Sequence, residues 1–432
     1  MLEGYTFLAD FPSPRDPGNM LPMSPRLFIQ ETGRRVAPLD DAVQDVLIQN
    51  RPLREWQQEM VQNGGFDLVT ERQPFTVIIP DTLFTHHKVL TEFASRAEGR
   101  NAVLVLATSA FGTQTTPVQP GVVATEDGWR FEEIQYLGEN DEPPVDIVID
   151  PDEKVMPIEM PVRYIEGQSL ELSLPRYPIM TIHHWLHILQ ANQVAGAMLL
   201  RNTPTWRVAI AALWAVVRAV SLNKWKILAK MNRIGKNCDI HPTAVIEGST
   251  IGDNVTIGPY CRVLFSTVGY QAMILPGAHV EASVIGTRAM VGQSCTIRFC
   301  VTYPESMASQ DTMQRCLLGR GALTTPGSYA IDLNFAQSIR VPLDGELHDT
   351  KSHFLGSAFG HGSLFATGLW MASGRMVPNH AFVIKETSEV ISKLPSVASK
   401  DRALVNHNGT LVPLGTSQEN GAQSMEGGDE NS

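Results

Sequence analysis

Two histidines eight residues apart are the side chains of this sequence best placed for proton transfer near neutral pH. His353 and His361 flank the glycine-containing segment SHFLGSAFGHGSLF, where a substrate could approach the backbone closely. Asp344 and Asp349, a few residues earlier, are available to orient an imidazole. The segment is therefore a candidate for general acid–base chemistry, although an exposed loop histidine is also ordinary.

Metal ligation is a second chemistry to consider, because His183 and His187 are four residues apart and would share one face of a helix. No carboxylate or thiol is close enough in the sequence to complete the ligand set. The five cysteines also lack the CxxC spacing that zinc sites favour. We therefore expect a packed helix at His183 and His187, and reduced, buried thiols elsewhere.

Length and charge limit the functions open to the chain. With 432 residues we expect two domains, and 43% hydrophobic residues indicate a folded protein. The formal net charge of -11 repels a phosphate backbone, and no basic patch is evident, so nucleic acid is excluded as an expected partner. The N-terminus has no basic region followed by an apolar run, so we expect a cytoplasmic location.

The elements that must position any site begin with an internal repeat between residues 234 and 297. Aliphatic residues recur in steps of six, six and five, which gives a period of 17 over four turns. An α-helix cannot use this spacing, whereas three short strands joined by corners can close one triangular coil and stack on the next. The positions are Ile234, Ile240, Ile246, Ile251, Ile257, Val263, Val268, Ile274, Val280, Ile285, Val291 and Ile297.

The repeat resembles the left-handed parallel β-helix of hexapeptide-repeat acyltransferases, which also forms the C-terminal domain of sugar-nucleotide pyrophosphorylases. We expect this domain over residues 234–395, with a rhythm that fails after Val301, partly resumes in the segment CLLGRGALTTPG and returns as a hexad at Phe359. Between them, residues near 339–355 are expected to form a hairpin or loop directed outward from the prism. The acyltransferase resemblance implies acyl-CoA as cofactor, His353 or His361 as general base, and a homo-oligomer with prisms side by side.

Residues 1–190 alternate buried strand patterns with helical ones, which predicts an α/β domain with a largely parallel sheet. Their opening is similar to sugar-nucleotide pyrophosphorylases. This second resemblance implies that Gly33, Arg34 and Arg35 bind nucleotide phosphates and that Asp81, after the strand VIIP, holds Mg²⁺. The sequence departs from that family in having one glycine in the loop QETG, no matching lysine and no convincing second aspartate, so the domain is expected to be degenerate.

A helical linker is expected at 191–233, joining the two domains. Within it, residues 206–226 form an apolar helix interrupted by Arg207 and Arg218, which share one face. Such a helix could contact a membrane surface, or it could cap the open end of the prism or pack between the domains. The polar, acidic tail at 414–432 is expected to be disordered.

The fold class expected is thus α/β plus β, a degenerate nucleotidyltransferase-like domain followed by a left-handed β-helix. From resemblance alone, we favour a sugar-nucleotide-linked transferase that takes a nucleotide or sugar-phosphate substrate in polysaccharide or envelope precursor metabolism. An acyl-CoA-dependent acyltransferase and a non-catalytic, self-assembling scaffold are the alternatives. A zinc-dependent carbonic anhydrase ranks third, because three closely spaced histidines are not found.

Overall fold

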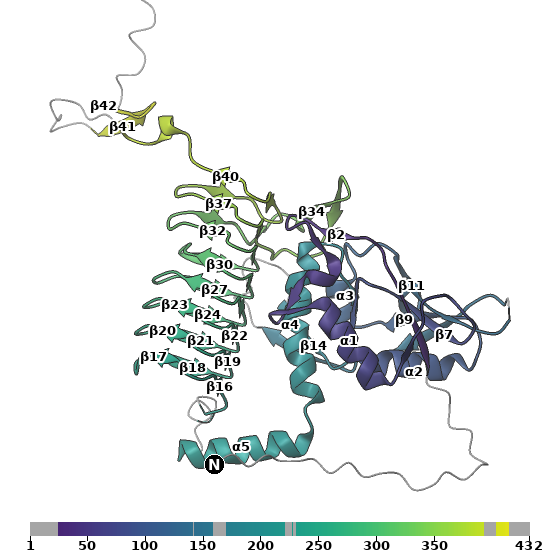
Figure 1. The fold of residues 1–432 in the computed structure, drawn as a ribbon. Helices are drawn as coiled ribbons and strands as arrows, with labels where there is room; N and C mark the ends of the chain where they lie inside the picture. Colours follow the sequence, from purple (N-terminus) through teal and green to yellow (C-terminus); the bar gives the residue numbers. More distant parts are fainter. Residues whose placement is uncertain are drawn as a thin grey trace, which may run out of the picture.

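The computed structural model describes residues 25–140, 142–158, 170–220, 227, 230–392 and 403–413. A stack of short strands forms a prism beside an α/β domain, and helix α4 (Trp185–Asn202) of that domain runs along the side of the stack (Figure 1). The tail at 414–432 and residues 221–226 of the expected linker helix lie outside the described residues.

The N-terminal domain is built on a mixed sheet in the order β12-β9-β11-β7-β1-β6, with β10 added beside β11. Strand β1 pairs in parallel with both β6 and β7, and β12 pairs in parallel with β9. Strand β11 is antiparallel to β7 and β9, so the sheet is less uniformly parallel than expected. The bounds are β1 Arg26–Gln30, β6 Asp67–Leu68, β7 Thr76–Pro80, β9 Ala102–Ala107, β10 Val122–Ala124, β11 Gly128–Leu137 and β12 Val145–Ile149.

Helices and short strand pairs surround this sheet. Helix α1 ends at Gly65, which adopts φ 65°, a left-handed conformation that glycine tolerates without strain. The helices are α1 Leu53–Gly64, α2 His87–Ala97, α3 Ala110–Thr115, α4 Trp185–Asn202 and α5 Thr205–Ala219, with a 3₁₀ turn η1 at Val43–Asp45. The short strands are β2 Arg35–Val36, β3 Asp41–Ala42, β4 Leu47–Ile48, β5 Arg51–Pro52, β8 Leu83–Thr85, β13 Glu153–Ile158, β14 Leu170–Pro175 and β15 Ile179–Thr181.

Three parallel sheets form the sides of the prism, as the six-six-five spacing predicts. The first is β16 Arg233–Ile234, β19 Thr250–Ile251, β22 Thr267–Val268, β25 Val284–Ile285, β28 Val301–Thr302, β31 Leu317–Leu318, β36 Ala358–Phe359 and β39 Met376–Val377. The second is β17 Asp239–Ile240, β20 Thr256–Ile257, β23 Met273–Ile274, β26 Met290–Val291, β29 Met307–Ala308, β32 Leu323–Thr324, β37 Leu364–Phe365 and β40 Phe382–Val383. The third is β18 Val245–Glu247, β21 Arg262–Leu264, β24 His279–Glu281, β27 Thr296–Arg298 and β30 Thr312–Gln314, continued by the pair β33 Tyr329–Ala330 and β38 Trp370–Met371.

The ladder register reproduces the repeat measured in the sequence. Ile234 pairs with Ile251, Ile251 with Val268, and Val268 with Ile285, so each partner lies one full period further along the chain. From Ile251 onward these aliphatics are buried in one continuous core inside the prism. The stacked parallel sheets fit the left-handed β-helix that the sequence predicts.

The expected break after Val301 is wrong, because the prism continues without interruption through the next coil. Val301 pairs with Leu317 and Ile297 with Met313, so this coil is one residue shorter than those before it. Its inward positions carry Thr302, Ala308 and Met313, all buried, in place of isoleucine or valine. The backbone ladder thus continues while the aliphatic pattern that reveals it in the sequence is lost.

The chain leaves the prism between β33 and β36. A hairpin forms there from β34 (Arg340–Leu343) and β35 (Glu346–Asp349), with its turn at Asp344 and Gly345. The hairpin projects toward the N-terminal domain (Figure 1). Beyond the prism lie a 3₁₀ turn, η2 (Thr387–Glu389), and a final hairpin of β41 (Leu404–His407) and β42 (Thr410–Pro413).

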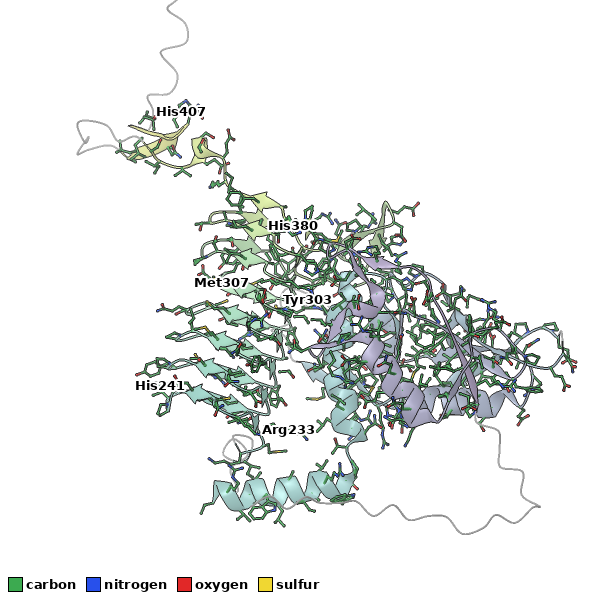
Figure 2. All side chains as sticks on the ribbon, in the orientation of Figure 1. Arg233, His241, Tyr303, Met307, His380 and His407 are labelled. Atoms are coloured by element: carbon green, nitrogen blue, oxygen red, sulfur yellow. The ribbon has the colours of Figure 1, made fainter. Side chains whose placement is uncertain are left out.

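The two domains share a hydrophobic core. Val284, Val301 and Leu317, from the first sheet of the prism, belong to the same buried cluster as the interior of the N-terminal domain. Tyr303 is fully buried between the two, and its hydroxyl accepts a hydrogen bond from the Leu47 amide at 2.8 Å. Figure 2 places Tyr303 on the side of the prism that faces the N-terminal domain, opposite His241. The relative placement of the domains is therefore defined by packing.

Helix α5 lies beneath the first coil of the prism (Figure 1). Its large apolar side chains are exposed, at 48% to 65% of their surface, and the inward-facing Ile234 of the first coil is also 51% exposed. The apolar stripe of α5 therefore does not cover the open end of the prism. No helix among the described residues is long and apolar enough to span a membrane.

Candidate active site

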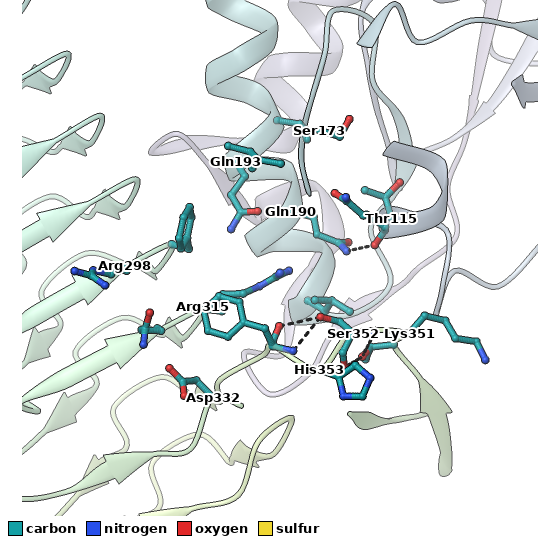
Figure 3. Close-up of a pocket in the computed structure, with 18 of the residues that line it drawn as sticks. Thr115, Ser173, Gln190, Gln193, Arg298, Arg315, Asp332, Lys351, Ser352 and His353 are labelled. Carbon is teal, nitrogen blue, oxygen red and sulfur yellow. Dashed lines mark hydrogen bonds between the residues drawn. The ribbon is translucent and has the colours of Figure 1, made fainter. Parts of the chain in front are cut away.

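A cavity of about 540 Å³ lies between the N-terminal domain and the prism. Helices α3 and α4 and strand β14 form one wall, and strands β24, β27 and β30 form the opposite one. The segment 350–354, which follows the hairpin, lines it as well (Figure 3). A concave site of this size at a domain interface, with polar groups from both sides, is the usual setting for a small-molecule ligand.

Helix α4 is held rigidly in its wall by side chains that cap its first turn. The His184 ring accepts a hydrogen bond from the Leu186 amide, and the His187 ring accepts from the amides of His183 and His184. Gln190, one turn further, donates to the Gln114 carbonyl at 2.6 Å and lines the cavity. The His187 ring therefore caps the helix, whereas the ring of His183 is buried with neither nitrogen hydrogen bonded. Among the described residues, no group of three or more potential ligands could hold a metal.

Strand β14 contributes Ser173, which is oriented by a carboxylate. The Ser173 hydroxyl donates to Glu153 at 2.5 Å, and the same carboxylate accepts the Ala110 and Phe111 amides at 2.8 Å each. These amides open helix α3, where a negative charge is favourable. The Ser173 hydroxyl and the Glu153 carboxylate thus make this wall of the cavity polar, and both groups already have hydrogen-bond partners within the chain.

The prism wall presents one row of charged residues. Glu281 and Arg298 are register partners on adjacent coils, and their side chains form an ion pair at 3.2 Å. Gln314 follows in the same row on the next coil. The row arises because equivalent positions of successive coils stack directly, so side chains that are one coil apart in the sequence become neighbours.

Arg315 stands at the corner that follows this row. It adopts φ 46°, as the corner residues Phe265, Ala282 and Phe299 of earlier coils do at 48°, 46° and 52°. Its guanidinium group lies over the Phe354 ring, 5.7 Å from the centroid, and its Nε atom is buried without a hydrogen-bond partner. Burial lowers the pKa of Arg315 to about 10. The side chain as a whole is only partly buried, so the cation lies in the cavity lining with its Nε atom covered.

Asp332 is a further titratable group that the prism contributes to the cavity lining. Burial raises its pKa, and hydrogen bonds from its own backbone amide and the Gln314 side chain partly offset this effect. Its carboxylate is thus already engaged by neighbours on the prism. Figure 3 shows Asp332 and Arg315 projecting from the same side of the cavity.

His353 lies in the segment 350–354 and has one ring nitrogen fixed. Its Nδ1 atom is 2.8 Å from the carbonyl oxygen of Asn334, and its own carbonyl accepts the Asn334 amide at 2.9 Å. A carbonyl oxygen can only accept, so Nδ1 carries a proton, and in the neutral ring the lone pair is then on Nε2. The residue lines the cavity, as Figure 3 shows. A neutral imidazole with this tautomer is the form that a general base requires.

His361 has both ring nitrogens engaged and lies outside the cavity lining. Its Nδ1 accepts the Arg320 amide at 2.7 Å, so Nε2 carries the proton and faces Asp41 at 3.2 Å. Asp41 belongs to β3 of the N-terminal domain, and the two side chains are largely buried, with exposed fractions of 15% and 17%. This contact joins the two domains and leaves no ring atom for a substrate.

The aspartates suggested as imidazole partners are placed elsewhere. Asp344, at the tip of the hairpin, pairs with Arg34 at 2.9 Å, and Asp349 pairs with Lys351 at 3.1 Å. The groups that orient the two histidines are instead the Asn334 carbonyl and Asp41. A backbone carbonyl has no sequence signature, and Asp41 is distant from its partner along the chain, so neither was accessible to sequence reasoning.

The residues predicted to bind nucleotide and magnesium are only partly brought together. Thr32 donates to Asp81 at 2.6 Å where β1 and β7 end, and Asp81 is 4% exposed. Arg34 is near them but is paired with Asp344, while Arg35 pairs with Asp40 at the surface. Gly33 adopts φ 66° in the loop between β1 and β2.

One further carboxylate lies in the neighbourhood of Asp81. Burial raises the pKa of Glu133, and the charge of Asp81 raises it further. Since no group of three or more potential ligands exists among the described residues, magnesium at Asp81 receives no support. These residues do not line the cavity that holds His353.

Comparisons with known proteins found distant likenesses to solved structures. No family model matches the chain, and no curated protein matches it either. Similar solved structures include a Bacillus cereus protein provisionally named an acetyltransferase, at 15% identity and TM-score 0.15, covering 33% of this chain and 79% of that one. A hexapeptide transferase family protein from Anaplasma phagocytophilum has 17% identity and TM-score 0.13, with coverages of 33% and 76%.

A third solved structure is a variant of GDP-perosamine N-acetyl transferase from Caulobacter crescentus, in complex with CoA and GDP-perosamine. It has 17% identity and TM-score 0.14, and the match covers 36% of this chain and 53% of that one. At these scores the likenesses carry no argument about chemistry. Function must be argued from the site itself.

Proposed function

We propose that this chain is an acyltransferase that moves an acyl group from an acyl-CoA thioester to a hydroxyl or amine bound in the interdomain cavity. The observation that supports the proposal is the hydrogen bonding of His353, a residue of the cavity lining, whose Nδ1 is committed to the Asn334 carbonyl while Nε2 has no hydrogen-bond partner among the described residues. The β-helix is the scaffold that the repeat resembles in acyltransferases, and this resemblance is an analogy of fold.

In the proposed reaction, Nε2 of His353 accepts the proton of the attacking hydroxyl or amine. The nucleophile adds to the thioester carbonyl, the carbon–sulfur bond breaks, and the thiol leaves with a proton returned from the imidazole. Acyl-CoA is the cosubstrate, and the acyl acceptor is a small molecule able to enter a cavity of about 540 Å³.

Nucleotidyl transfer is the function favoured by the resemblance of residues 1–190. The contacts of the residues predicted to bind nucleotide and magnesium do not support it. Asp81 is hydrogen bonded to Thr32, and Arg34 is occupied by Asp344. We therefore rank it behind acyl transfer. A scaffold without activity remains the third candidate and is separated from both by the experiment that follows.

The test is release of free CoA thiol from acetyl-CoA in the presence of a panel of amino and hydroxylated sugars and sugar phosphates. We expect thiol release that depends on one acceptor class and falls about 100-fold or more in His353→Gln. His241→Gln is the matched control, because His241 is exposed on the opposite side of the prism. Thiol release that is unchanged in His353→Gln would reject the proposed base. If none of the acceptors causes thiol release and the protein binds a nucleoside triphosphate in a Mg²⁺-dependent way, nucleotidyl transfer is favoured.

A further inference from the structure

The cavity holds three cations, and only two of them have a carboxylate partner. Arg298 pairs with Glu281 at 3.2 Å, and Lys351 pairs with Asp349 at 3.1 Å. Arg315 forms no ion pair with any carboxylate of the described residues, and its contact is the Phe354 ring. Among the cations that line this cavity, Arg315 is thus the exception that requires an explanation.

The environment of Arg315 makes an accidental placement costly. Its Nε atom is buried without a hydrogen-bond acceptor, and the left-handed corner at φ 46° directs the residue from the prism toward the N-terminal domain. A guanidinium group withdrawn from water without a counter-charge destabilises the folded state. Equivalent corners of earlier coils carry Phe265, Ala282 and Phe299, so the fold does not need a charge at this position.

Neighbouring acidic groups do not account for the missing counter-charge. Asp332, on the same wall, is hydrogen bonded by its own amide and the Gln314 side chain. Glu153 on the opposite wall is occupied by Ser173 and two backbone amides. Each of these carboxylates therefore already has donors of its own, and Arg315 is open to an acceptor that enters the cavity.

We propose that Arg315 binds an oxyanion group, a carboxylate or a phosphate, of the substrate that enters the cavity. The planar guanidinium fork matches both groups through paired hydrogen bonds, and the ring of Phe354 behind it limits competition from water. This inference rests on the proposed function, since it defines the substrate class for the same site: an anionic molecule, with Arg315 holding its charged group and His353 its reacting hydroxyl or amine.

The oxyanion has two sources, the acyl acceptor and the phosphates of CoA. The two are distinguished by comparing acetyl-CoA with acetyl-pantetheine, which lacks the nucleotide phosphates. If the group belongs to CoA, Arg315→Gln raises KM for acetyl-CoA and leaves KM for acetyl-pantetheine unchanged. If it belongs to the acceptor, Arg315→Gln raises KM for the acceptor with either donor.

Direct binding tests the site without any need for turnover. We expect inorganic phosphate or succinate, titrated calorimetrically into the full chain, to bind the wild type about tenfold or more tightly than Arg315→Gln. Arg315→Lys, which keeps the charge but not the fork, should retain part of the affinity. Arg288→Gln is the matched control, since Arg288 is exposed on the same prism and paired with Glu305.

The same variants also show how much the unpaired charge of Arg315 destabilises the folded protein. In the absence of ligand, Arg315→Gln should unfold at a temperature no lower than the wild type, because it removes a partly buried charge that has no carboxylate partner. Equal phosphate and succinate binding in wild type and Arg315→Gln, or no binding of either by the wild type, would overturn the inference. Arg315-dependent binding without any acyl transfer would instead refute the proposed function and leave the oxyanion site standing.

Discussion

At the scale of single residues, two histidines with similar sequence surroundings are placed in different roles. His353 has one nitrogen bound and one available at a cavity, whereas both nitrogens of His361 are bound. The sequence predicted both as candidate bases and did not distinguish between them. What distinguishes them is a set of contacts from Asn334, Arg320 and Asp41, which only the folded chain supplies.

His361→Ala is expected to destabilise the protein and to leave acyl transfer intact. The change removes the acceptor of the Arg320 amide and the donor to Asp41 at the domain boundary, which we expect to cost about 1 to 3 kcal/mol of unfolding free energy. Urea unfolding and thiol release measure the two effects separately. A variant of normal stability that has lost turnover would return His361 to the catalytic role. Asp41→Asn, which keeps an acceptor oxygen, should show a smaller loss of stability.

The histidines at the start of α4 predict an acid-sensitive fold. Burial, with a further contribution from His187, lowers the pKa of His184 to about 3, and burial, with His183, lowers that of His187 to about 3. Below the unfolded pKa near 6.5, the unfolded chain binds protons that the folded chain does not. Stability is therefore fully present above pH 6.5 and is lost as the pH falls, by about 1.4 kcal/mol per pH unit for each such group.

His184→Asn isolates this effect, because asparagine can also cap the helix but does not titrate. Urea unfolding between pH 7 and pH 4.5 should show a shallower loss of stability in the variant than in the wild type. His241→Asn, at an exposed histidine of the prism, should keep the wild-type slope. Equal slopes in His184→Asn and the wild type would show that His184 is not neutral and buried in the folded chain.

At the scale of elements, the regular coils were accessible to sequence reasoning and the irregular one was not. Isoleucine or valine at every inward position from Ile234 to Ile297 made the repeat visible. The next coil replaces them with Thr302, Ala308 and Met313 and is one residue shorter, so both signals disappear together. Backbone hydrogen bonds between coils do not depend on the side chain, and the ladder continues.

Met313→Ala tests whether residues 302–314 form a true coil. Met313 is fully buried in the prism, so its truncation should cost about 2 to 4 kcal/mol of unfolding free energy. Met307→Ala is the matched control, because Met307 is only partly buried on the outward side of the preceding strand and should cost about 1 kcal/mol or less. Urea unfolding compares the two, and equal small losses would mean that the segment is a loop.

Helix α5 presents an exposed apolar stripe and is flanked by basic residues. This combination favours binding of the helix to an anionic lipid surface over a role as cap of the prism. Its exposed side chains recur at helical spacing and are Trp206, Ile210, Leu213, Trp214 and Val217. The sequence from 172 to 238 contains no acidic residue, although the chain as a whole carries a net charge of -11. Eight basic residues fall between 201 and 236: Arg201, Arg207, Arg218, Lys224, Lys226, Lys230, Arg233 and Lys236.

We expect the full chain to float with vesicles of phosphatidylcholine and phosphatidylglycerol, and less with phosphatidylcholine alone, because attraction to anionic lipid adds to burial of the stripe. Leu213→Glu should abolish flotation. Ala211→Glu adds the same charge at an exposed position beside the stripe and should reduce flotation much less. Flotation that is equal for both variants, or absent in the wild type, would contradict binding of the stripe to anionic lipid.

At the scale of the whole molecule, the candidate site exists only because two domains pack together. Arg315 comes from the prism and His353 from the segment after its hairpin, while Gln190 and Ser173 come from the N-terminal domain. The two pairs lie far apart along the chain, and no local pattern links them. The sequence therefore predicted the architecture of each part, an α/β sheet and a β-helix, but not the cavity between them.

The packing of the two domains also bears on the predicted homo-oligomer. The resemblance to hexapeptide acyltransferases implied a histidine between neighbouring prisms, whereas here the cavity around His353 is lined by a single chain. A homo-oligomer remains a prediction. Within one chain, the two facing walls of the cavity already bring His353 and Gln190 into the same lining.

Chemical rescue of His353→Ala tests the central claim most directly, since it asks whether a base is missing at that place and nothing else. Thiol release from acetyl-CoA should fall about 100-fold or more in the variant and rise again in proportion to added imidazole. The wild type and His361→Ala should not respond to imidazole. A His353→Ala protein that releases thiol at the wild-type rate would contradict the account.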